Sequence, residues 1–255
     1  MINILYSNDY ELYLGGNHLP EDEVLLRPTE SLLAACEDLG IPMTNFVDVA
    51  CLWRYRESGE SSFPDAVDKQ LTHALTRGHD VQAHVHPHWM DTNIVRGTND
   101  MAHYETDPDT FLLAHCAQRA GRHLRDFTTG IATRIRRYLD DLLLPVDDDY
   151  RCVAFRAGGF GLQPGEHEII GGLYDAGFRI DSSVVPGMRE HTNVNRIDFS
   201  DVPTRGNYFI DANDGLTAAA QQGLFEIPVL AVGPSDARFA LARTLIRKVA
   251  RRLRG

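Results

Sequence analysis

The sequence predicts an α/β fold built on a parallel sheet, and three observations support this. Predicted strands and helices alternate along most of the 255 residues. Such alternation is typical of parallel strands joined by helical crossovers. Polar side chains able to do chemistry also follow several strands at their carboxyl ends, where such folds build their sites. An open doubly wound sheet and a closed β/α barrel both fit this pattern.

The first half of the chain supplies three strands and two helices. Strands are predicted at residues 2–7, 44–49 and 80–83, and helices at 27–39 and 64–77. Pro28 suits the first turn of the first helix, and Gly40 and Gly78 stand where helices commonly end. Apolar residues recur in each helix at the spacing of one buried face.

The second half continues this order less regularly. Helices are predicted near 110–120, at 128–144 and at 166–176, and strands at 152–157, 178–181 and 225–230. Residues 183–222 are expected to be a long loop. We expect residues 1–234 to form one domain and residues 235–255 to form a basic amphipathic helix.

The composition indicates a globular protein of the cytoplasm. Hydrophobic residues make up 43% of the chain, and the net charge is −11. An acidic chain is not expected to bind nucleic acid, because general phosphate-backbone binders are usually basic. The four cysteines form no CxxC pair and are expected to be reduced thiols. No secretory leader and no apolar run of about 20 residues is visible.

The C-terminal segment reverses the charge of the rest of the chain. From residue 237 onward it carries seven Arg or Lys residues and no acidic residue. A surface helix packed on the domain, with solvated arginines, is the favoured interpretation. Peripheral contact with an anionic membrane is the alternative.

The stretch GHDVQAHVHPHW, residues 78–89, contains three histidines at alternate positions. Pro87 cannot donate a ladder hydrogen bond, so a central strand is not expected to run through it. If the chain turns helically after His84, then His84 and His88 are i,i+4 neighbours that can grip one metal ion. His86 would then line the pocket or hydrogen-bond to a ligand residue.

A hydrolytic metal site needs three protein ligands and an open position for water. Asp9 or Glu11, after the first strand, is the natural third ligand. The metal would lower the pKa of bound water to about 7 and polarise a carbonyl. A second carboxylate could take the water's proton, and Arg156 could orient that carboxylate. Alternatively, the acidic pair is a solvated turn, and Arg156 and Asp181 have structural roles.

Four motifs occur in order: SNDYE, GHDVQAHVHPH, FRAGGFG and RIDSS. Together they resemble the polysaccharide deacetylases of carbohydrate esterase family 4, the NodB-homology proteins, over about residues 2–230. The resemblance implies a distorted (β/α)7 barrel. It also implies metal-dependent hydrolysis of an N-acyl group, usually acetyl, from an amino sugar of a polysaccharide or glycoconjugate.

The resemblance also implies roles for single residues. The expected metal ligands are Asp9, Glu11, His84 and His88, and zinc is the expected ion. The expected catalytic residues are Asp9, Arg156, which would orient the catalytic carboxylate, and Asp181, which would support the arginine. The expected substrate contacts are His86, Trp89 and Phe160.

The sequence departs from the family in three places. The family has two adjacent aspartates where this chain reads Asn8-Asp9-Tyr10-Glu11, so base and ligand are not assigned between Asp9 and Glu11. No histidine follows His191, so the family's C-terminal acid is unassigned, with His18, His103 and His191 as candidates. The barrel can also be incomplete at its C-terminal end.

These departures keep two alternatives open. One is a catalytically inactive protein of the same fold that binds a glycan or a partner protein. The other is a metal-free hydrolase acting on a small amide. The sequence does not define the oligomeric state.

Overall fold

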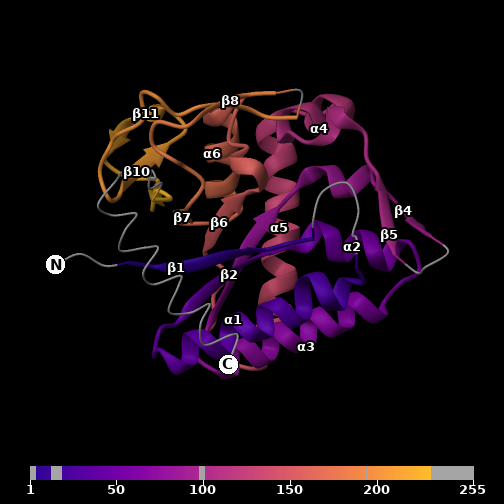
Figure 1. Cartoon of the computed structure of the whole chain (residues 1–255). Helices are drawn as coiled ribbons and strands as arrows, with labels where there is room; N and C mark the ends of the chain where they lie inside the picture. The colour runs from indigo at the N-terminus through magenta and orange to yellow at the C-terminus, as the bar shows by residue number, and fades with distance from the viewer. Residues whose placement is uncertain (1–3, 13–18, 98–100, 193, 231–255) are drawn as a thin grey trace.

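A computed structural model describes residues 4–12, 19–97, 101–192 and 194–230. Its centre is an eight-stranded sheet in the order β1-β2-β3-β6-β7-β12-β10-β11 (Figure 1). The first six strands of that order run parallel to one another. Strand β10 is antiparallel to β12, and β11 is antiparallel to β10. The strands are β1 (Tyr6–Tyr10), β2 (Met43–Asp48), β3 (Asp80–Val85), β6 (Ala154–Ala157), β7 (Ile180–Asp181), β12 (Leu224–Glu226), β10 (Tyr208–Asp211) and β11 (Gly215–Ala220).

The predicted α/β class and its parallel sheet are therefore confirmed, whereas closure into a barrel is not. Among the described residues, no ladder joins β1 to β11. The sheet ends in an antiparallel hairpin, β10–β11, in place of further β/α units. A hairpin needs only a short turn, whereas each added parallel strand needs a crossover of a dozen or more residues.

Helices cover the sheet and connect its parallel strands. They are η1 (Asp22–Leu26), α1 (Arg27–Asp38), α2 (Val49–Glu57), α3 (Ser62–Thr76), η2 (Pro87–Asp91), η3 (Pro108–Thr110), α4 (Leu113–Arg119), α5 (Leu124–Leu143), η4 (Gly158–Phe160) and α6 (Glu166–Asp175). The predicted stops are confirmed, because Gly40 and Gly78 follow helices with positive φ angles of 65° and 85°. Helix α5 contacts α3, α6 and β3, and buries Ile131, Ile135 and Leu139.

The register of the central strands aligns three polar side chains. Asp48 of β2 pairs with His84 of β3, and His84 pairs in turn with Arg156 of β6. All three are at most 7% exposed. Paired positions of a sheet project to the same face, so this register sets a polar row near the carboxyl ends of the strands.

Several elements differ from the sequence-based expectations. Strand β1 runs to Tyr10, later than predicted, because its pairing with β2 continues to Tyr10 opposite Val47. Helix α2 was not predicted. The last predicted strand, 225–230, shortens to β12, since Pro228 lacks the N–H that a ladder needs.

The expected long loop at 183–222 contains β8 (Arg189–His191), β9 (Arg196–Asp198), β10 and β11, and the region after β3 contains the hairpin β4 (Asn93–Arg96) and β5 (Ala102–Glu105). Figure 1 shows β4–β5 and β10–β11 on opposite sides of the molecule. Strands this short carry too few residues for a clear alternating pattern.

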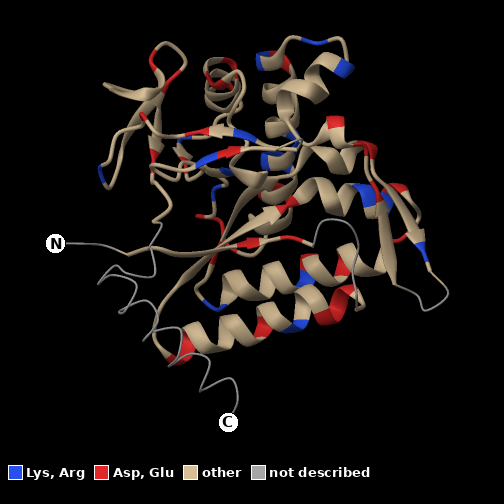
Figure 2. Ribbon diagram, turned by 45° about the horizontal axis from the view of Figure 1, so that its top comes forward, with Lys and Arg blue, Asp and Glu red and all other residues tan. Residues whose placement is uncertain are grey.

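All four cysteines are free and buried, as reduced thiols would be. Within the described ranges, no helix is both long and apolar enough to cross a bilayer. Figure 2 shows Lys and Arg positions interspersed with Asp and Glu positions along the fold. The predicted basic helix at 235–255 lies outside the described residues, and so do residues 2 and 3 of the first predicted strand.

Candidate metal centre

Glu11, His84 and His86 converge at the carboxyl ends of β1 and β3. One ligand atom from each lies within 4.8 Å of the other two. His84 Nε2 is 3.2 Å from Glu11 Oε2, and His86 Nε2 contacts the same oxygen. The two imidazole centroids are 5.0 Å apart. Both histidines are buried, and one third of the Glu11 side chain is exposed.

This grouping corrects the expected i,i+4 arrangement of His84 and His88. Strand β3 continues through Val85, and His86 itself is extended, with φ −102° and ψ 107°. Only then does Pro87 begin the 3₁₀ helix η2. Because alternate strand residues face the same side, His84 and His86 form the neighbouring pair. The strand ends before Pro87, as expected. The helical turn begins at Pro87, two residues later than an i,i+4 pair of His84 and His88 would require.

His88 lies in an aromatic cluster and is not part of the three-residue group. Its ring stacks on Phe111 at 4.7 Å and lies 5.1 Å from the Trp89 ring. Burial, together with the charge of His86, lowers the pKa of His88 to about 3. His88 is therefore a neutral ring at physiological pH.

The three grouped side chains are strongly coupled. Burial opposes ionisation of Glu11. The hydrogen bonds from His84 and His86 outweigh this effect of burial and hold the pKa of Glu11 well below its ordinary value. Burial likewise opposes protonation of His86, but the Glu11 carboxylate raises the pKa of that imidazole above its ordinary value. Glu11 is therefore an anion that attracts positive charge to this point.

Two imidazoles and one carboxylate are a fitting donor set for a divalent metal ion. Catalytic zinc sites use His₂Glu sets of this kind and leave a fourth position open. The Nε2 atoms of both histidines already face the Glu11 carboxylate, and its partly exposed side chain leaves access from solvent. Glu11, His84 and His86 could therefore hold zinc without rearrangement of the sheet.

Asp9 lies two residues before Glu11 and is held by Arg156. Asp9 Oδ1 accepts a hydrogen bond of 2.7 Å from Arg156 Nη1. The Asp9 side chain is one third exposed, whereas that of Arg156 is 9% exposed. Asp9 is not in the ligand group, so the structure separates the two carboxylates: Glu11 faces the histidines and Asp9 faces the arginine.

Arg156 is fixed from several directions. Its Nε donates to the Ser182 carbonyl at 2.9 Å, and its Nη2 donates to Ser7 Oγ at 2.9 Å and to Ser182 Oγ at 3.0 Å. The guanidinium also lies 4.1 Å above the centroid of Phe46. A guanidinium with this many partners has little freedom, so it can orient Asp9.

Asp181 supports Arg156 only indirectly. Its two carboxylate oxygens accept from the Ser183 N–H at 3.0 Å and from Ser183 Oγ at 2.9 Å. Ser183 Oγ accepts in turn from the Ala157 N–H at 2.9 Å. Asp181 therefore fixes the turn that carries Ser182, and Ser182 contacts the arginine.

Glu226 is a buried carboxyl group that the sequence-based reasoning missed. It pairs with Asp181 in the β7–β12 ladder, and its Oε1 accepts from the Val184 N–H at 3.3 Å. Burial, reinforced by the charge of Asp181, raises the pKa of Glu226 well above its ordinary value. Glu226 is the single carboxylate in the sequence FEIPVL and belongs to no motif. Its place among apolar residues of a predicted strand was the signal that it could be buried.

Asp48 is a second missed carboxylate, and it is 2% exposed. Its Oδ1 accepts from the His86 N–H at 3.3 Å. Burial raises the pKa of Asp48 to about 6, although the charges of His86 and His84 oppose this. Its position at the end of a predicted parallel strand was the available signal.

The expected substrate contacts differ in their accessibility. Trp89 is 1% exposed and packs on Tyr104, so it belongs to the core. His86 belongs to the ligand group. Phe160 is partly buried and has a positive φ of 59°. Of the candidate acids, His103 lies exposed in β5 and His191 exposed in β8, while His18 falls outside the described residues.

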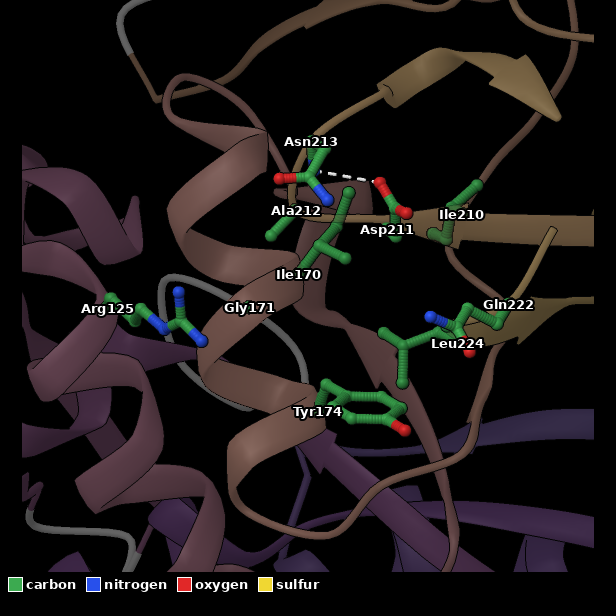
Figure 3. A pocket seen from close by; sticks show the side chains of 11 residues that line it. Arg125, Ile170, Gly171, Tyr174, Ile210, Asp211, Ala212, Asn213, Gln222 and Leu224 are labelled. Carbon is green, nitrogen blue, oxygen red and sulfur yellow. Dashed lines mark hydrogen bonds between the residues drawn. The ribbon is translucent and has the colours of Figure 1, made fainter. Parts of the chain in front are cut away.

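A cavity of about 170 Å³ lies away from this centre, between α6 and strands β10 and β12 (Figure 3). Ile170, Tyr174 and Leu224 contribute to its lining. Of its two charged lining residues, Arg125 pairs with Asp175 at 2.7 Å, and Asp211 accepts from the Asn213 N–H at 2.8 Å. None of the residues that line the cavity belongs to the Glu11–His84–His86 group.

Gly158 packs directly beneath His86, which generates a first prediction. A Cβ at position 158 would lie 2.5 Å from the Val85 carbonyl oxygen and 2.6 Å from His86 Cγ and Nδ1. We expect Gly158→Ala to displace the His86 ring and weaken zinc binding by at least about tenfold. Competition with a chromophoric chelator measures this. Gly206→Ala, with no atom within 4 Å of the added carbon, is the control; equal affinities for all three proteins would contradict the prediction.

The buried pair Asp181–Glu226 generates a second prediction. The folded protein binds the Glu226 proton more tightly than the unfolded chain, so the contribution of Glu226 to wild-type stability falls as pH rises above about 4.5. Glu226→Gln imitates the neutral carboxyl group and removes this loss. We expect the variant's advantage to grow by at most about 1.4 kcal/mol per pH unit. Urea unfolding at several pH values measures it, with the exposed Glu105→Gln as control; an advantage independent of pH would contradict it.

Comparison with known proteins adds a distant structural likeness. The sequence matches no protein-family model and no curated protein. One similar solved structure is a "putative polysaccharide deacetylase" from Mycobacterium smegmatis, with a TM-score of 0.41 and 14% sequence identity. The likeness covers 86% of this chain, and the chain spans 58% of that structure. We therefore base the function on the centre itself.

Proposed function

We propose that this protein is a metal-dependent hydrolase that removes an N-acyl group, acetyl in the simplest case, from an amino sugar of a polysaccharide or glycoconjugate. The observation that carries the proposal is the convergence of Glu11, His84 and His86 beside the Asp9–Arg156 pair. A metal donor set and a separately oriented carboxylate are the two components that such a hydrolysis needs.

The residues divide the work between them. Glu11, His84 and His86 would hold the ion, which supplies Lewis acidity toward water and the substrate carbonyl. Asp9 takes the proton of the attacking water. Arg156 directs Asp9 through the 2.7 Å hydrogen bond. The exposed third of the Asp9 side chain gives it access to a substrate in solution.

The charged groups at the centre are compatible with an uncharged substrate group. Asp9 and Glu11 lie at the solvent side of the site, and Asp48 lies buried beneath His86. The nearby guanidinium of Arg156 already donates to Asp9, Ser7 and Ser182. With a divalent ion bound, the charges of the ion and of Arg156 would offset the negative charges of Asp9, Glu11 and Asp48, so an uncharged amide would meet no large net charge at the centre.

The position of Tyr10 bears on the metal-free alternative. If Asp9 matches the first family aspartate, Tyr10 occupies the place of the second. Its side chain is buried, and its hydroxyl donates to Gln70 at 2.7 Å. Glu11 instead presents the carboxylate to the histidines. The lost aspartate is therefore replaced one position later, which favours retention of a metal centre.

The ligand assignment predicts a specific pattern of metal loss. We expect wild type and His88→Phe to bind about one zinc ion per chain, and Glu11→Gln, His84→Ala and His86→Ala to lose it. Phenylalanine retains the stacking partner of Phe111, so His88→Phe is a matched control. Elemental mass spectrometry on untagged protein measures the content. Zinc-free wild type would refute the metallohydrolase. Loss of zinc in His84→Ala and His88→Phe, with retention in His86→Ala, would restore the i,i+4 pair.

The assignment of Asp9 predicts loss of activity without loss of metal. We expect wild type to release acetate from N-acetylated amino-sugar oligomers, and Asp9→Asn to be slower by about 100-fold or more while it retains zinc. Acetate is quantified enzymatically alongside metal content. A zinc-loaded wild type without turnover on such oligomers would support the inactive glycan-binding alternative. Full activity in metal-free wild type would establish the metal-free hydrolase.

A further inference from the structure

The buried polar atoms that have no hydrogen-bond partner within the described residues include Asp48 Oδ2 and His84 Nδ1, beside the candidate metal centre. Both side chains belong to the polar row of the central strands. Asp48 is 2% exposed and His84 is 1% exposed. Unpartnered buried polar atoms are uncommon in folded proteins, and each needs a physical explanation.

The strand register places the two residues side by side. Asp48 and His84 are paired positions of the parallel β2–β3 ladder. Neighbouring strands are about 4.8 Å apart, and paired side chains leave the sheet on the same face. A carboxylate oxygen and an imidazole nitrogen at such positions can meet through rotation of their side chains alone.

We propose that Asp48 is a positioning residue of the metal centre, whose Oδ2 accepts the Nδ1–H hydrogen bond of His84 and thereby directs His84 Nε2 at the ion. The inference rests on the proposed metal centre. It deepens that proposal by assigning a second layer of support to the ligands.

The ligand chemistry favours this pairing. A histidine that binds metal through Nε2 carries its proton on Nδ1, and that proton is normally donated to a carboxylate or carbonyl oxygen. His84 Nε2 faces Glu11, so Nδ1 is the nitrogen left for a supporting acceptor. Asp48 offers the unpartnered oxygen that this nitrogen needs.

The other Asp48 oxygen extends the same role to the second histidine. Asp48 Oδ1 already accepts from the His86 backbone N–H at 3.3 Å. One carboxylate would therefore hold His84 through its ring and His86 through its main chain. Arg156, the other neighbour of His84 in the row, directs its donors to Asp9, Ser7 and Ser182 instead.

Zinc affinity and the histidine ring protons test the inference on the full chain. Asp48→Asn keeps the side-chain volume but can place an N–H₂ group opposite His84 Nδ1. We expect it to weaken zinc binding by about 10–100-fold. Asp80→Asn makes the same chemical change at the opposite end of β3 and is the matched control, with wild-type affinity expected. Chelator competition measures all three proteins.

Nitrogen-15 spectra of the histidine rings supply a readout that a merely structural role would not move. We expect zinc-loaded wild type to show His84 bound through Nε2, with a slowly exchanging Nδ1–H proton. In Asp48→Asn this proton should exchange rapidly. The wild-type spectrum tests the inference even if the variant does not fold. Binding of the metal through His84 Nδ1 in wild type would overturn the inference.

The outcomes for the inference and for the metal centre are distinct. Tight zinc binding by wild type and Asp48→Asn alike, with the Nδ1–H signal unchanged, would overturn the role of Asp48 and leave the centre intact. Wild type that binds no zinc would overturn both. Weakened binding in Asp48→Asn but not in Asp80→Asn, with the loss of the slow proton, would support the inference.

Discussion

Parallel pairing of β2, β3 and β6 aligns Asp48, His84 and Arg156 across the sheet, and the rest of the centre depends on this row. The backbone hydrogen bonds of the ladder set the spacing, so no loop has to hold these side chains in place. Strand β1 pairs with β2 in the same direction and brings Asp9 and Glu11 to the same edge. Arg156 then meets Asp9, and His84 meets Glu11.

A centre with this many buried ionisable groups requires compensation for each charge. Arg156 is compensated by Asp9 and by oxygens of Ser7 and Ser182. The buried carboxyl groups of Asp181 and Glu226 avoid a double negative charge in another way: burial raises both pKa values, so the pair retains a proton. Glu11 is compensated by imidazoles, which also makes that position the one where a divalent ion can replace bound protons. Each of these buried groups thus has a different physical solution, and among them the Glu11 group offers a donor set compatible with a divalent metal.

The sequence predicts the framework well where local physics decides it. Helix ends at Gly40 and Gly78, and the strand before the histidines, follow from turn chemistry and apolar spacing. The choice between His86 and His88 does not follow, because it depends on where β3 stops pairing with its neighbours. Asp48 and Glu226 were missed for a related reason: a lone carboxylate has no motif, and only the register shows that it faces another polar group. Short strands such as β8 and β9 depend on each other for stability more than on a local pattern.

The i,i+2 spacing of His84 and His86 makes the proposed metal binding sensitive to strand alignment. Successive strand residues face opposite sides, so a slip of β3 by one residue would turn both imidazoles away from Glu11 together. No partly aligned chain would keep one imidazole in place and lose the other. Capture of a metal ion would therefore occur only after correct pairing of the central strands, and a metal pulse during refolding would label the moment at which the sheet reaches its native alignment.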